Sequence, residues 1–311
     1  MINAPNLACI ILALAAPAAS AAGSLRGSRR TQSEGMVTTE GPTDIDIAIA
    51  KFALNAQADC HSVPNIGFRV PLQLECLEAE FYSYAAYGYG LTDDLRGYGP
   101  EPIGGMKATL SPEVQAYAEE IAKNEIAHVG VLRAALGNLA PACPQIDIGP
   151  AFAAVANAAA ATVFDPPYTP YDNDTSFLLG AFLFEDVGVT AYNGAAPLLT
   201  NKGILSTAAS ILAVEAYHGG SLRTLLYQQE DVVLTPHTFT VGEAVALASA
   251  LRASVGGGKD KALETDGVLS IMPVDENSLA FARTATEVLN IVYLGSASTP
   301  GGFFPNGINM A

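Results

Sequence analysis

Tryptophan is absent from this chain of 311 residues, and basic residues are scarce. The 15 Lys and Arg are outnumbered by 31 Asp and Glu, which gives a formal net charge of −16. Because there is no basic stripe and no interleaving of aromatic and basic residues, we expect no nucleic-acid partner. No CxxC pair occurs, which argues against a zinc ribbon or a thioredoxin-type site. Beyond the amino terminus no apolar run is long enough for a membrane span, so we expect none.

What the chain does have is apolar residues, which make up 50% of it, while 15% are charged. Ala-rich stretches with Leu, Ile and Val favour closely packed helices. This composition is sufficient for a buried core in one or two domains.

The amino terminus has the pattern of a targeting segment. Leu7–Ala16 is an apolar run of signal-peptide length, and Ala19-Ser20-Ala21 is a small-x-small cleavage pattern. We therefore predict a signal peptide over residues 1–21 and a secreted protein, extracellular or in the cell wall. An organelle transit peptide is the alternative, because no Lys or Arg precedes the run and three arginines follow it. Residues 22–43 are rich in Gly, Ser, Thr and Arg and are predicted to be a flexible lead.

Four long segments between residues 44 and 230 have helical patterns, and a shorter one lies at 45–54. Pro71 interrupts the chain, so the first long helix is expected to start just after it. N-caps, glycine stops and apolar spacing predict the ranges 72–87, 111–136, 176–192 and 206–228. The link between the second and third helices, residues 140–174, is long and contains an Ala-rich stretch at 152–162 that can form a short helix. Such a crossover turns the third helix in the direction that a four-helix bundle with one long connection needs.

Residues 231–311 are predicted to form an extension that packs on the bundle. Helical patterns occur at 241–255 and at 278–293. The tail from Pro300 to Gly307 has too many Gly and Pro residues for regular structure. We expect it to be an ordered loop that packs Phe303 and Phe304 on the bundle, and a mobile end is the alternative.

The loop before the third helix contains a modification sequence. Asn173-Asp174-Thr175 is an N-glycosylation pattern among Pro, Tyr and Asp residues, so we predict a glycoprotein. Thr175 can also serve as the cap of the next helix, and both interpretations can hold together.

Two of the four histidines follow a glutamate by three residues within predicted helices. Glu125 and His128 lie in the second long helix, and Glu215 and His218 lie in the fourth. Positions i and i+3 share one helix face, so a carboxylate and an imidazole can reach the same metal ion. In di-iron and di-manganese bundles, two helices supply this motif and the other two supply one glutamate each.

The remaining glutamates lie in the other two helices. The first helix offers Glu75, Glu78 and Glu80, and the third offers Glu185, with Asp186 beside it. Glu75 precedes Tyr82 by seven residues and Glu185 precedes Tyr192 by seven, so one sequence unit occurs twice on helix faces two turns long. This repeat selects Glu75 over Glu78 as the ligand. The tyrosines are either hydrogen-bond donors beside the metals or ordinary core aromatics.

The helix faces around these six side chains are apolar. Four glutamates and two histidines buried there without partners would be very costly. Two iron or manganese ions would neutralise them, since both metals accept carboxylate and imidazole ligands. Glu75 and Glu185 would be terminal ligands, Glu125 and Glu215 would bridge the metals, and each histidine would bind one metal. Two alternatives stay open: solvated glutamates that pair locally with the histidines, and buried carboxylates that share protons without metal.

Four cysteines are present, of which Cys9 would leave with the signal peptide. The three that remain predict one disulfide and one free thiol in a secreted protein. We predict a Cys60–Cys143 bridge, because these residues lie at adjoining ends of the first two antiparallel helices. Cys76 would then contribute to helix packing. Three unpaired, mostly buried thiols are the alternative.

Several motifs also give the chain a family resemblance. Leu72–Tyr82, with the sequence LQLECLEAEFY, resembles the first bundle helix of the desiccation-related proteins of plants, algae and microbes. Gly88–Leu91, Pro102–Gly105 and the tail Pro300–Gly307 are similar to further signatures of that family. The resemblance implies an all-α fold: a ferritin-like four-helix bundle with a long crossover over residues 44–230 and a helical and loop C-terminal extension. It also implies secretion or a cell-wall location and accumulation under water stress.

The doubled Glu-x-x-His pattern also resembles bacterioferritin, rubrerythrin and manganese catalase, which implies iron oxidation, peroxide reduction or peroxide disproportionation. The long loops, the extension and the signal peptide depart from cage ferritins, so we expect no 24-subunit shell. Our functional prediction is a secreted stress protein that uses two iron or manganese ions to handle iron or reactive oxygen, with oxygen or peroxide as substrate. The alternatives are a non-catalytic protective protein on the same scaffold and a wall-binding module, which secretion alone supports.

Overall fold

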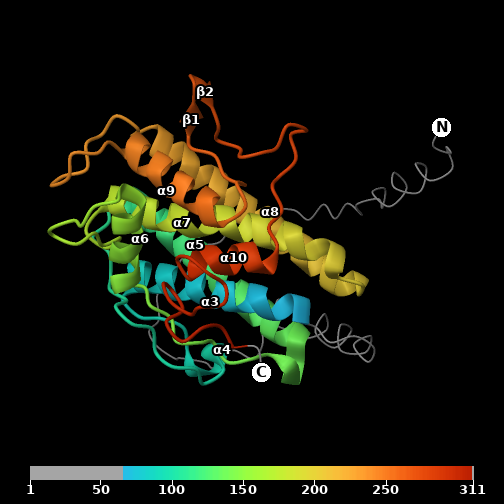
Figure 1. Cartoon of the computed structure of the whole chain (residues 1–311). Helices are drawn as coiled ribbons and strands as arrows, with labels where there is room; N and C mark the ends of the chain where they lie inside the picture. Colours follow the sequence, from blue (N-terminus) through green and yellow to red (C-terminus); the bar gives the residue numbers. More distant parts are fainter. Residues whose placement is uncertain (1–65, 310–311) are drawn as a thin grey trace, which may run out of the picture. The chain divides into compact units, whose positions relative to one another are not determined.

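A computed structural model describes residues 66–309 of the chain (Figure 1). Within this range the fold is all-α apart from one short hairpin, as predicted. The predicted signal peptide, flexible lead and helix at 45–54 lie outside the described residues. Four long helices form the bundle: α3 (Ile66–Tyr87), α5 (Pro112–Leu136), α7 (Asp174–Ala195) and α8 (Lys202–Tyr227).

Shorter elements connect these helices and form the C-terminal extension. Before α8 they are α4 (Asp93–Arg96), the 3-10 turns η2 (Gly137–Leu139) and η3 (Ala196–Leu198), and α6 (Pro150–Ala160), which is the short helix predicted in the crossover. The extension contains α9 (Val241–Val255), the antiparallel strands β1 (Glu264–Thr265) and β2 (Val268–Leu269), and α10 (Ala285–Val292).

The long helices pack as two antiparallel pairs, α3 with α5 and α7 with α8. In the first pair, Gln115 near the start of α5 donates to the carbonyl of Ala86 near the end of α3, at 2.9 Å. Farther along the pair, His128 of α5 lies against Glu75 of α3. The long crossover between α5 and α7 then places α7 against α3, so that the two pairs close into one bundle (Figure 1).

Capping side chains determine where the long helices start. Ser111 caps α5 by accepting from the amide of Val114, and Pro112 occupies the first helical position, as predicted. Asn173 caps α7, so the capping interpretation of Thr175 is wrong. Asn201 caps α8, which therefore starts earlier than its predicted range.

Two helices differ from prediction at their amino ends. α3 starts at Ile66 and contains Pro71, although we placed its start after this proline. Pro71 is the sixth residue of this helix, so its missing N–H removes one intrahelical hydrogen bond and the helix continues beyond it. α10 begins only after Thr284, which forms a capping box with Glu287. Ser278, the predicted start, has a φ of +61°, outside the right-handed helical region.

The structure corrects the predicted disulfide. Cys143 is bonded to Cys76, with their Cα atoms 5.9 Å apart, so the predicted Cys60–Cys143 bridge is wrong. The loop after α5 folds back along α3 and brings Cys143 against the buried Cys76. Its backbone is held there by a hydrogen bond from the Cys143 amide to the carbonyl of Arg96. Cys60 lies outside the described residues.

The C-terminal extension packs on the bundle. α9 contacts α6 and α7, and α10 contacts α7 and α9. In the tail, the ring centroid of Phe303 lies 5.2 Å from that of Phe152 and 4.8 Å from that of Phe184. Phe304 is fully buried. The prediction of an ordered tail that packs both phenylalanines is therefore confirmed.

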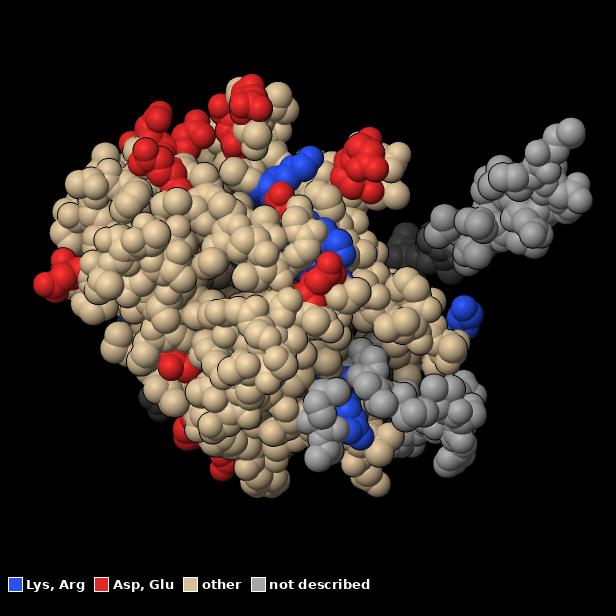
Figure 2. Space-filling model, viewed as in Figure 1, with Lys and Arg blue, Asp and Glu red and all other residues tan. Residues whose placement is uncertain are grey.

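The face of the molecule shown in Figure 2 is largely uncharged; most of its Asp and Glu residues lie in separate small groups near the rim, and one group lies inside the face beside Lys and Arg. Among the described residues, no helix combines the length and the apolar character that crossing a membrane requires.

Candidate metal centre

The four long helices each point acidic side chains into the middle of the bundle. α3 provides Glu75 and α7 provides Glu185, while α5 and α8 each provide a glutamate and a histidine. All six side chains predicted as ligands are buried: the four glutamates are at most 1% exposed, and His128 and His218 are 8% and 6% exposed. The i, i+3 spacing on α5 and α8 places each histidine on the same inward face as its glutamate.

The six residues form two overlapping groups. Glu75, Glu125, His128 and Glu215 each offer one ligand atom, and these atoms lie within 4.8 Å of one another. The same holds for Glu125, Glu185, Glu215 and His218. Glu125 and Glu215 belong to both groups. The geometry is thus that of two adjacent cation positions that share two carboxylates.

Both imidazoles face this cluster with the Nδ1 atom. His128 Nδ1 lies 3.1 Å from Glu75 Oε2 and 3.2 Å from Glu125 Oε2. His218 Nδ1 lies 3.1 Å from Glu125 Oε1 and 3.3 Å from Glu185 Oε2. On its far side, His218 Nε2 lies 3.1 Å from Nδ2 of the Asn124 side-chain amide.

The two tyrosines bind the terminal glutamates in a crossed arrangement. Tyr82 of α3 donates to Oε1 of Glu185 on α7, and Tyr192 of α7 donates to Oε1 of Glu75 on α3. The sequence repeat pairs each tyrosine with the glutamate of its own helix, whereas the structure pairs it with the glutamate of the facing helix. Each terminal glutamate thereby has one oxygen bound by a tyrosine, while its other oxygen faces a histidine.

The charges of the cluster are strongly perturbed. Burial raises the pKa of Glu75 to about 8, and it raises the pKa of Glu215 well above its ordinary value. Burial would lower the pKa of His218, but the nearby Glu185 and Glu125 raise it to about 11. Burial also opposes ionisation of Glu125, yet His128 and His218 hold its pKa well below its usual range.

The donor set fits two cations of the iron or manganese type. Several buried ligand atoms make no hydrogen bond: Glu125 Oε1, Glu185 Oε2, both oxygens of Glu215 and Nδ1 of His218. All of these except Glu215 Oε2 lie within 3.5 Å of an oppositely charged partner in the cluster. Buried polar groups without hydrogen bonds are costly, and a cation that binds them removes the cost. Carboxylate oxygen and imidazole nitrogen together are ligands that iron and manganese accept.

The sequence analysis assigned no role to a second buried cluster behind α7. Asp186, next to Glu185, accepts from Arg223 at 2.8 Å and from Arg252 at 2.9 Å. Arg252 also donates to Asp260 at 2.8 Å, and Arg283 donates to the same carboxylate. This network ties the extension to the helix that carries Glu185. The pattern of the sequence gives no sign of it, because its members come from distant segments.

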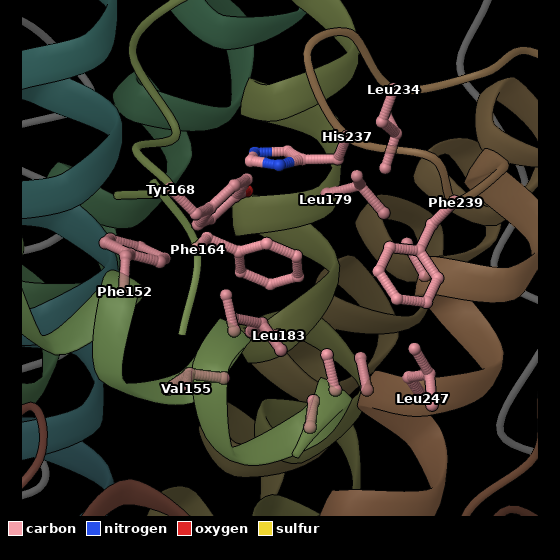
Figure 3. A pocket seen from close by; sticks show the side chains of 15 residues that line it. Phe152, Val155, Phe164, Tyr168, Leu179, Leu183, Leu234, His237, Phe239 and Leu247 are labelled. Atoms are coloured by element: carbon pink, nitrogen blue, oxygen red, sulfur yellow. The ribbon is translucent and has the colours of Figure 1, made fainter. Parts of the chain in front are cut away.

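Of the two remaining histidines, His61 lies outside the described residues, and His237 is in neither group of ligand atoms. His237 lies beside an apolar cavity between α6, α7 and α9, where its ring is tilted by 53° against that of Phe164 with the centroids 4.5 Å apart (Figure 3). Neither was predicted as a ligand.

Four helices that each contribute acids to a central histidine-containing cluster define a carboxylate-type four-helix bundle. The model of the ferritin-like domain matches residues 67–228, and the chain belongs to this family. It is 34% identical over 250 residues to the desiccation-related protein PCC13-62 of Craterostigma plantagineum, covering 76% of this chain and 79% of that protein. It is 32% identical over 254 residues to the ferritin-like catalase Nec2 of Nesocodon mauritianus, covering 77% and 81%. No solved structure matches the chain.

Proposed function

We propose that this chain is a secreted stress protein that disproportionates hydrogen peroxide at two iron or manganese ions. One observation carries the proposal: two groups of four buried ligands share Glu125 and Glu215. In this arrangement Glu75 and His128 would hold one ion, Glu185 and His218 the other, and the shared glutamates both. A pair of redox-active ions supplies a two-electron couple, so that one peroxide is reduced to two waters and a second is oxidised to dioxygen.

The protein's own residues would keep this chemistry confined. The Tyr82 and Tyr192 hydroxyls hold one oxygen of each terminal glutamate, which leaves the other oxygen oriented toward an ion. The complete burial of the glutamates excludes bulk water from the centre. The two histidines are the ligands with the greatest exposure, so a molecule as small as peroxide would reach the centre from their side.

The relatives support the activity and the setting. One similar protein is named a ferritin-like catalase, and another is named a desiccation-related protein. Together they favour peroxide chemistry during water stress over a storage function. The apolar run Leu7–Ala16 supports secretion. Asn173 supports glycosylation, because it is exposed and its cap uses the side-chain oxygen rather than the nitrogen.

Oxygen release from hydrogen peroxide tests the proposal. Wild-type protein reconstituted with Mn²⁺ or Fe²⁺ should release one dioxygen for every two peroxides consumed. The His128→Ala/His218→Ala double variant should lose this activity, whereas His237→Ala should retain it, because His237 lies outside the cluster. If metal binding raises the melting temperature but the protein releases no oxygen from peroxide, the alternative of a non-catalytic, protective protein is favoured.

A further inference from the structure

The centre has an approximate internal two-fold symmetry. Glu75 and Tyr82 of α3 correspond to Glu185 and Tyr192 of α7, and the Glu-x-x-His motif of α5 corresponds to that of α8. A two-fold axis between α3 and α7 relates the Tyr82–Glu185 hydrogen bond to the Tyr192–Glu75 hydrogen bond. Between the glutamate and the tyrosine the two segments differ. Three residues after the terminal glutamate, α3 has Glu78 and α7 has Gly188.

Glu78 is buried among other acids. Only 3% of its surface is exposed. Burial raises its pKa well above the ordinary value, and repulsion from Glu215, Glu125, Glu75 and Glu185 raises it further, in that order of strength. Glu78 is in neither group of four ligand atoms, but it lies beside Glu215, since both side chains approach the same glycine, Gly188.

Gly188 leaves the room that this placement needs. A Cβ atom at position 188 would lie 2.1 Å from Glu215 Oε2 and 3.3 Å from Glu78 Oε1. The first distance is far inside van der Waals contact, so a side chain at 188 would displace Glu215. The space between positions 78 and 188 therefore holds one side chain, that of Glu78, because the equivalent residue on α7 is Gly188.

We infer that Glu78 is a fifth carboxylate ligand of the centre, placed at its shared middle beside Glu215. This inference rests on the proposed metal centre. Both oxygens of the neighbouring Glu215 are buried without a hydrogen-bond partner. A cation bound beside Glu215 and Glu78 would satisfy them. Four carboxylates balance the charge of two divalent ions. A fifth therefore favours an additional positive charge, so Glu78 stabilises the more oxidised form of the pair.

The Glu78→Gln variant tests this assignment through metal binding rather than turnover. Mn²⁺ affinity would be measured by competition with a chelator, and the electron paramagnetic resonance spectrum of the Mn²⁺-loaded protein would report coupling between the ions. We expect the weaker of the two binding steps to lose affinity by ~10–100-fold and the coupled spectrum to change. The matched control is Glu80→Gln, a buried glutamate on the same helix that accepts from the Leu91 amide and lies near Arg96 instead. It should bind Mn²⁺ as the wild type does.

Unchanged affinity and spectrum in a folded Glu78→Gln variant would overturn the inference. If that variant fails to fold, Glu78→Met removes the carboxylate with an unbranched side chain of similar length, and a wild-type affinity there would likewise contradict the assignment. Loss of coupling in Glu78→Gln together with a wild type that releases no oxygen would uphold this ligand and refute the peroxide activity. A wild type that binds neither Mn²⁺ nor Fe²⁺ would contradict both.

Discussion

At the scale of single residues, each terminal glutamate divides its two oxygens between a tyrosine and the cation position. Replacing Tyr82 with Phe would leave Oε1 of Glu185 buried without its donor. We expect Tyr82→Phe to weaken metal binding by roughly tenfold, and Tyr192→Phe to do the same through Glu75. Chelator competition with each variant checks this. Wild-type affinity in both variants would show that the tyrosines are only core aromatics.

Protons compete with metal at the histidines. Glu185 and Glu125 raise the pKa of His218 to about 11 against the desolvation that lowers it, so without metal this imidazole is protonated at neutral pH. A cation must displace that proton, so metal affinity should rise with pH, by up to about tenfold per unit for each proton released. Calorimetry in buffers of different ionisation enthalpy measures the release. His218→Ala should release fewer protons, and a pH-independent affinity would contradict this account.

The sequence predicts the centre well at this scale, because the i, i+3 motif is local. The structure brings all six predicted side chains together, and their role as ligands stays a prediction. The crossing of Tyr82 and Tyr192 depends on how α3 faces α7, which spacing within one helix cannot reveal. For the same reason the repeat selected Glu75 and set Glu78 aside, although both point into the bundle.

At the scale of elements, the Cys76–Cys143 bridge ties α3 to the loop after α5. It closes a segment with a sequence separation of 67 residues. Removing it with Cys143→Ser should lower the free energy of unfolding by about 4 kcal/mol, because the unfolded chain gains loop entropy. Urea unfolding of the variant beside oxidised wild type measures the loss. Equal stability of variant and oxidised wild type would contradict the expected contribution.

The buried Asp186–Arg252–Asp260 network joins the extension to α7. Asp260→Ala would leave Arg252 and Arg283 without one of their partners in a nearly dry environment, at a cost of about 3–5 kcal/mol. The exposed Glu264 in the same extension is the matched control, and Glu264→Ala should change stability by less than about 0.5 kcal/mol. Thermal unfolding compares them. Equal melting temperatures would mean that the network does not stabilise the extension.

Helices with strong local signals were predicted most closely. α5 has a serine cap followed by proline and a glycine at its end, and α9 has a capping box, so both match their predicted ranges. α3 was predicted too short because local rules read Pro71 as a boundary, whereas the helix continues through it. The Cys76–Cys143 bridge was missed because it depends on where the loop after α5 lies in space.

At the scale of the whole molecule, the extension and the bundle form one core around the centre. Phe303 and Phe304 anchor the tail. The net charge of −16 should draw cations toward the protein before they reach the buried ligands. The long loops and the extension distinguish this chain from helical bundles that consist of little more than the four helices.

Elemental analysis tests the central claim most directly. Wild-type protein reconstituted with Fe²⁺ or Mn²⁺ would be compared with the Glu125→Ala/Glu215→Ala double variant, which lacks both shared carboxylates. The account predicts about two ions per chain in the wild type and their loss in the variant. No bound iron or manganese in the reconstituted wild type, or equal metal content in the two proteins, would contradict it.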